Sequence, residues 1–147
     1  MKRVVIVGAT SRIAECCARR WTASGATFFL VARDQEHLGR LRADLSVRGG
    51  HPEQIGASAF DALDYGSFPA IAQAADEFLG GIDVVLIAHG TLPEQSACEQ
   101  DLDQARSALE INGLSAVLLA EAFAMRMAPA GRAHGEATPR GGVRRRR

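Results

Sequence analysis

The chain has 147 residues, 47% of them apolar and 23% charged, and its formal net charge is zero. This length allows one domain with a modest core, and the composition is typical of globular proteins rather than disordered or fibrous ones. No uninterrupted apolar run reaches the roughly 18 residues that span a bilayer, so we expect a cytoplasmic protein without a membrane segment. The three cysteines and four histidines are scattered, which predicts no disulfide framework and no metal site.

The balanced charge conceals two parts of different composition. Residues 1–128 carry 11 basic and 16 acidic side chains, whereas residues 129–147 carry six arginines and one glutamate. The second part is rich in Gly, Pro, Ala and Arg, and such a segment buries too little apolar area to offset its ordering entropy. We therefore expect a folded body over 1–128 and a disordered Arg/Gly/Pro-rich tail over 129–147, which we interpret as a frameshift or truncation product.

Strands and helices alternate along the body. Two apolar runs, 2–7 and 27–32, predict buried parallel strands. A weaker third strand is expected over 54–60, and 82–90 contains the fourth strand and its exit turn. Four longer stretches predict helices: 13–24, 34–47, 64–79 and 101–128. Asp34 is the expected cap of the second helix, and 91–99 reads as a polar loop. This alternation predicts an α/β fold, a Rossmann-like doubly wound parallel sheet of strand order 3-2-1-4, truncated after the fourth strand and the long helix.

The turn after the first strand, GATSRI, has features of a phosphate-binding turn. Gly8 allows the chain to turn tightly, and the small residues Thr10 and Ser11 let backbone and hydroxyl groups line the concavity. Arg12 carries a guanidinium that matches phosphate geometry, and we expect Ile13 to anchor the following helix in the core. An ordinary strand-to-helix turn with small residues is the alternative interpretation.

Five motifs in chain order resemble the short-chain dehydrogenase/reductase family, in particular its members with a G-A-T-S-x-I turn. They are the turn itself, then LVARD, FDALD, IAHG in the place of the family's N-A-G motif, and EINGLS. The resemblance covers residues 1–128. It implies an NAD(P)-dependent oxidoreductase that transfers a hydride to or from a carbonyl or alcohol substrate.

Three charged residues are candidate cofactor contacts. Arg33 ends the second strand, where an arginine favours the 2′-phosphate of NADP over the free ribose hydroxyl of NAD. Together with Arg12 it predicts NADP, with NAD as the alternative. The resemblance implies that Asp61 accepts a hydrogen bond from the adenine amino group. An exposed strand-end charge for Arg33 and a turn aspartate for Asp61 are the competing interpretations.

The exit of the fourth strand and the long helix supply the remaining candidates. Ala88 and Gly90 would let the cofactor lie across the sheet without side-chain collisions, although Gly90 could equally be an ordinary turn residue. Between them, we expect His89 to form a wall or to be exposed rather than to act in catalysis. The resemblance implies that Asn112 is the active-site asparagine, which holds a water or orients the proton relay; a hydrogen-bonded core amide is the alternative.

The family's proton donor is absent from this sequence. Family members use a tyrosine and a lysine four residues later, because the lysine lowers the pKa of the phenol. The only tyrosine here is Tyr65 and the only lysine is Lys2. We therefore predict that the chain is inactive as written.

Two other functions stay open. The first is a non-catalytic NAD(P)-binding regulatory module. The second is attachment of the arginine tail to nucleic acid or an acidic surface, although a solvated tail is the favoured reading because no aromatic residues are interleaved for base stacking. The resemblance further implies a homo-oligomer through the long helix 101–128.

Overall fold

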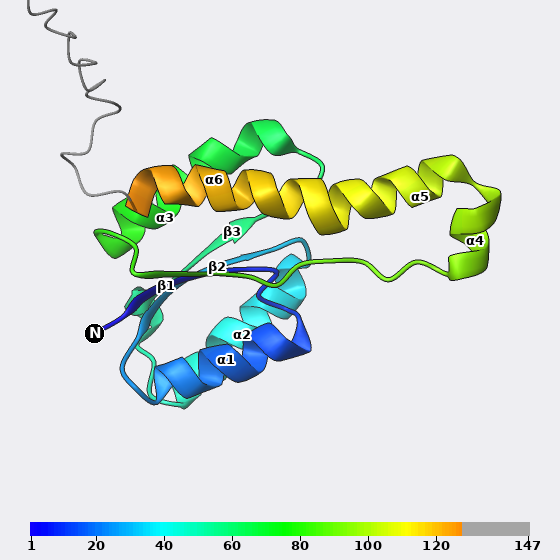
Figure 1. Cartoon of the computed structure of the whole chain (residues 1–147). Helices are drawn as coiled ribbons and strands as arrows, with labels where there is room; N and C mark the ends of the chain where they lie inside the picture. The colour runs from blue at the N-terminus through cyan, green and yellow to red at the C-terminus, as the bar shows by residue number, and fades with distance from the viewer. Residues whose placement is uncertain (128–147) are drawn as a thin grey trace, which may run out of the picture.

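A four-stranded parallel sheet lies between two layers of helices in the computed structural model, which describes residues 1–127 (Figure 1). The predicted tail over 129–147 lies outside the described residues. The strands are β1 (Arg3–Val7), β2 (Thr27–Ala32), β3 (Ile55–Ala59) and β4 (Val84–Ile87). They pair in the order β3-β2-β1-β4, and every pairing is parallel. The predicted Rossmann-like order is therefore confirmed.

Each face of the sheet is covered by two helices, visible below and above it in Figure 1. The lower layer is α1 (Arg12–Thr22) and α2 (Gln35–Val47), and the upper layer is α3 (Phe68–Leu79) and α6 (Ser115–Met127). Because successive side chains of a strand point to opposite faces, the buried residues of β1 alternate between two cores. Val4 and Ile6 belong to one cluster, and Val5 and Val7 belong to the other.

The region after β4 differs from the sequence prediction. The expected polar loop 91–99 contains a short helix, α4 (Gln95–Gln100), and the expected single helix 101–128 has three parts. These parts are α5 (Leu102–Leu109), the π-helical turn η3 (Glu110–Leu114) and α6. Two single 3₁₀ turns, η1 (Pro52–Gln54) and η2 (Tyr65–Ser67), precede β3 and α3.

The apolar face predicted for the long helix is buried only in its second half. Leu119 and Phe123 are buried, whereas the side chains of Leu102 and Leu109 are 83% and 73% exposed. Two physical causes explain the difference. The π turn changes the phase of the helix, and α4 and α5 extend past the edge of the sheet, where nothing described covers them (Figure 1).

The stretch Leu102–Met127 is long and apolar enough to cross a membrane by length and composition alone. Only 17% of its most apolar window is buried, although α6 packs against α3 and β4. A helix of a folded core can satisfy the same length and composition test, so this feature does not establish a membrane segment.

Candidate functional site

The carboxyl ends of all four strands surround one open cavity of about 460 Å³. In doubly wound sheets ligands bind at this edge, near the point where the strand order reverses. That point is β1 here, because β2 lies on one side of it and β4 on the other. The cavity brings together six of the predicted cofactor residues: Gly8, Thr10, Ser11, Arg33, Asp61 and Gly90.

Gly8 makes the tight turn between β1 and α1. Its φ of +76° is left-handed, and a Cβ atom there would lie 2.4 Å from the backbone nitrogen of His89. The turn is held from the other side by Val31, whose carbonyl oxygen accepts hydrogen bonds from the Gly8 and Ala9 amides at 2.8 and 3.1 Å. Only glycine satisfies both the backbone angle and the close contact.

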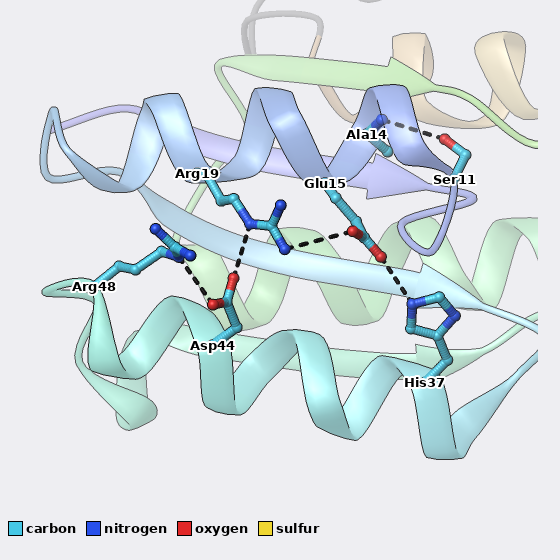
Figure 2. Close-up of polar contacts among 7 residues, drawn as sticks. All are labelled: Ser11, Ala14, Glu15, Arg19, His37, Asp44 and Arg48. Carbon is cyan, nitrogen blue, oxygen red and sulfur yellow. Dashed lines mark hydrogen bonds and ion pairs between the residues drawn. The ribbon is translucent and has the colours of Figure 1, made fainter.

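The amino end of α1 opens toward this cavity. Ser11 is the N-cap, and its hydroxyl oxygen accepts a hydrogen bond from the Ala14 amide at 3.2 Å (Figure 2). The other first N–H groups of a helix have no intrahelical partner, and together with the helix dipole they attract anions. Ala14 itself is completely buried against the sheet, so its single methyl group fits where the common fingerprint has a glycine.

The structure corrects the expectation for Ile13. We expected this side chain to anchor α1 in the core, but it is 74% exposed. The residues that face the sheet are Ala14 and Ala18, one turn apart, and the helical period then directs Ile13 toward solvent. Arg12 is also exposed, and neither residue lines the cavity. Their contacts with a cofactor stay predictions.

Polar and charged side chains link α1 to α2 (Figure 2). Glu15 lies 2.8 Å from His37 Nε2 and 3.5 Å from Arg19, and Arg19 in turn contacts Asp44 at 2.9 Å. Asp44 also pairs with Arg48 at 2.9 Å. The hydrogen bond from Arg19 lowers the pKa of Asp44. Because these side chains are partly exposed, the network orients the two helices and adds little stability.

Arg33 and Asp34 follow β2 and have different roles. Asp34 is the N-cap of α2, as predicted: its Oδ1 accepts a hydrogen bond from the His37 amide at 2.9 Å, which lowers the pKa of Asp34. Arg33 is exposed on the rim of the cavity. It also borders a second hollow of about 480 Å³ between β3 and α3. Its guanidinium is thus placed beside the cavity rather than within the core.

Asp61 has a structural partner as well as a place in the cavity wall. Its Oδ1 accepts a hydrogen bond from the Leu63 amide at 2.9 Å, which closes the turn after β3. The turn role that we considered as an alternative is therefore present. The adenine contact stays a prediction for the cavity side of the same residue.

Both polar atoms of the Asn112 side-chain amide form hydrogen bonds with the backbone that follows β4. Its Oδ1 accepts from the Thr91 amide at 2.7 Å, and its Nδ2 donates to the Thr91 carbonyl at 2.8 Å. A Cβ atom on Gly90 would lie 3.1 Å from Asn112 Oδ1, so the small residue keeps this contact open. The amide is thus hydrogen-bonded, although Asn112 is exposed rather than in the core. Ala88 packs against the α1 side of the sheet and does not line the cavity.

His89 and Ser115 form a contact that the sequence did not reveal. His89 lines the cavity, in agreement with the expected wall role, and its Nε2 lies 2.6 Å from Ser115 Oγ. The signal available in the sequence was a serine four residues before Leu119 on the expected apolar face of the long helix. Ser115 is completely buried there, and such a hydroxyl needs a partner. Within residues 1–127 no three His, Cys, Asp or Glu side chains gather as metal ligands.

Comparisons with known proteins agree with this geometry. The family model for short chain dehydrogenases matches residues 2–137. A 1-deoxy-11-beta-hydroxypentalenate dehydrogenase of Streptomyces exfoliatus is 32% identical over 133 residues, which are 89% of this chain and 47% of the relative. The dehydrogenase/reductase SDR family member 7B of Rattus norvegicus is 34% identical over 137 residues, 89% of this chain and 41% of the relative.

A solved structure shows the same fold. The short-chain dehydrogenase/reductase (glucose/ribitol dehydrogenase) from Brucella melitensis superimposes with a TM-score of 0.77 at 25% identity, over 86% of this chain and 50% of that one. The chain spans about half the length of these relatives. The strand order, the turn at Gly8 and the match along most of the sequence lead to one conclusion: this chain belongs to the short-chain dehydrogenase/reductase family of oxidoreductases.

Proposed function

We propose that this chain binds a nicotinamide dinucleotide in the cavity at the carboxyl ends of the strands. The observation that carries the proposal is the amino end of α1, which opens toward the cavity behind a glycine turn that admits no side chain. Unpaired helix N–H groups and the helix dipole stabilise the pyrophosphate of such a ligand. In the complete reaction of this family, the dinucleotide exchanges a hydride with a carbonyl or alcohol substrate.

NADP(H) is the preferred form in this proposal. An acid after β2 would accept a hydrogen bond from the free 2′-hydroxyl of NAD, but Asp34 already caps α2. Arg33 lies beside it on the cavity rim with an exposed guanidinium, which suits a 2′-phosphate. The two adjacent residues therefore favour the phosphorylated cofactor.

We further propose that this chain alone does not turn over a substrate. General-acid catalysis in this family needs a phenol whose pKa is lowered by a neighbouring lysine. The pKa of Tyr65 is raised instead, because partial burial removes water from the phenol, and its ring packs edge-on against Phe68. Lys2 is exposed beside β1, on a separate element from Tyr65. Binding without turnover is the role of a non-catalytic nucleotide-binding module.

Isothermal titration with NADPH, NADP⁺, NADH and NAD⁺ tests the binding proposal. We expect a single site, with NADPH bound about tenfold or more tightly than NADH, since a charge-assisted contact to Arg33 contributes about 1.5–3 kcal/mol. A parallel assay with ketones, aldehydes and keto-sugars should show no consumption of NADPH. Absence of binding heat on folded protein would contradict the binding proposal, and turnover would contradict the inactivity of the chain.

A further inference from the structure

The side chain of His89 connects the exit of β4 to the start of α6. Its Nε2 lies 2.6 Å from the Oγ of Ser115, a residue without solvent exposure. Ser115 donates its own proton to the Ile111 carbonyl oxygen at 2.7 Å, so the histidine must donate to Ser115 Oγ. The network therefore assigns the ring proton to Nε2. The other ring nitrogen, Nδ1, is buried and has no hydrogen-bond partner among residues 1–127.

The imidazole is also held in one orientation by its surroundings. It meets Phe60 in an edge-on arrangement with ring centroids 5.1 Å apart, and its own backbone lies against Gly8. Burial lowers the pKa of His89, which favours the neutral form of the ring. A neutral, oriented imidazole offers a single N–H donor in a fixed direction.

This donor acts on the π-helical turn η3. In the turn, the Ser115 amide donates a hydrogen bond to the Glu110 carbonyl oxygen, and the Ser115 hydroxyl donates one to the Ile111 carbonyl oxygen. Inserted π turns are uncommon in helices and recur at functional sites. The turn presents Ile111 to the cavity and lets Asn112 hold the backbone of Thr91.

We propose that His89 is a positioning residue of the nucleotide site, and that its hydrogen bond to Ser115 holds η3 in the register that forms the cavity wall. Besides His89 itself, this part of the wall includes Gly90, Thr91 and Ile111. The inference rests on the proposed function in one respect, because it takes this cavity to be the nucleotide site. An N–H donor is required at this position, and a hydrophobic side chain of similar volume does not replace it.

Two substitutions of His89 distinguish the effect of its N–H donor from the effect of its side-chain volume. His89→Gln keeps an N–H donor of similar reach, whereas His89→Leu fills the space without one. The first readout is hydrogen exchange of the Thr91 amide, which Asn112 protects. We expect exchange to accelerate about tenfold in His89→Leu and to stay within about threefold of the wild type in His89→Gln. His51→Leu, at an exposed histidine, is the matched control and should change nothing.

The second readout is the dissociation constant for NADPH. We expect it to rise about five- to tenfold in His89→Leu, because a buried hydroxyl loses its partner, and much less in His89→Gln. Ser115→Ala should behave like His89→Leu. The double variant should lose no more than either single one, because both remove the same hydrogen bond.

The outcomes separate this inference from the proposed function. If Thr91 exchanges equally fast in His89→Leu and His89→Gln, the donor does not position the turn and the inference is overturned, with or without ligand. If protection of Thr91 follows the donor but the wild-type chain binds no nicotinamide nucleotide, the positioning role of His89 is supported and the proposed function fails.

Discussion

Gly8 and His89 lie backbone against backbone, so that a Cβ atom on Gly8 would fall 2.4 Å from the His89 nitrogen and 2.6 Å from its Cα. This contact joins the turn after β1 to the exit of β4. It explains why Gly8 is a glycine in a turn that has one glycine where the common fingerprint has three. Backbone contact requires glycine at the first position, whereas the later position holds Ala14, which is buried in the core between α1 and the sheet.

Gly8→Ala should destabilise the fold strongly. The substitution combines a left-handed backbone with a collision against His89, which together cost about 2–4 kcal/mol. Gly25→Ala is the matched control, because Gly25 has a similar φ of +72° but nothing within 4 Å of the added atom. It should cost about 1–2 kcal/mol. Urea unfolding of both variants measures the difference, and equal losses would show that the contact with His89 is unimportant.

Arg33→Gln should change the choice of cofactor. The affinity for NADPH should fall about tenfold or more while the affinity for NADH stays the same, because in the proposed site the guanidinium would pair with the 2′-phosphate that only NADPH carries. Arg40→Gln provides the control, since Arg40 lies on α2, pairs with Glu36 and does not line the cavity. Titration of each variant with both nucleotides gives the ratio. An unchanged ratio in Arg33→Gln would remove the basis for NADP preference.

Stability should fall on mild acidification because of His89. Burial lowers its pKa in the folded protein below the usual 6.5, so the unfolded chain binds the proton more tightly. The free energy of unfolding is therefore highest above about pH 6.5 and decreases as the pH falls from there through the lowered pKa. In His89→Gln this part of the pH dependence should disappear. Urea unfolding at pH 7.5 and 5.5 checks it, and identical pH profiles would contradict it.

A second titration concerns the pair that joins β1 to the start of β4. Hydrogen bonds from the Arg3 side chain and amide lower the pKa of Asp83 to about 2. The stabilisation is therefore complete above about pH 3.8 and is lost as the pH falls through about 2. In Arg3→Gln the pKa of Asp83 should move back toward its usual value. Carboxyl NMR titration reads this shift directly, and an unmoved pKa would show that Arg3 is not its cause.

The strands were predictable because their signal is local. β1 and β2 are largely apolar runs that are almost entirely buried, and β2 has the bounds predicted for it. The cap of α2 was equally predictable, because Asp34 needs only the backbone amide of His37, three residues later, as its partner. The parallel order followed from the handedness of the crossovers rather than from any side chain.

The long helix shows why the rest was not predictable. A period of 3.6 residues places Leu109 and Leu119 on one stripe, but the π turn between them breaks the phase. No residue pattern in EINGL predicts that turn. The prediction that Ile13 packs in the core was wrong for a similar reason. The exact start of α1 decides whether Ile13 or Ala14 faces the sheet.

At the site, the sequence predicted residues that belong to local turns, but it did not predict contacts between residues that are distant in the chain. Gly8, Ser11 and Arg33 belong to turns whose chemistry is local, and the cavity contains all three. The bond between His89 and Ser115 joins residues 26 positions apart. Such a contact depends on how α6 packs on β4, which only the folded structure defines.

The most direct test of the account is a titration of the ¹⁵N-labelled protein with NADPH, followed by the amide resonances of residues 8–13. If the dinucleotide occupies the cavity at the ends of all four strands, these amides shift together with those of Arg33, Asp61 and Thr91. If NADPH leaves the resonances of the turn after β1 unchanged, or shifts only residues away from the cavity, the site is not where the account puts it.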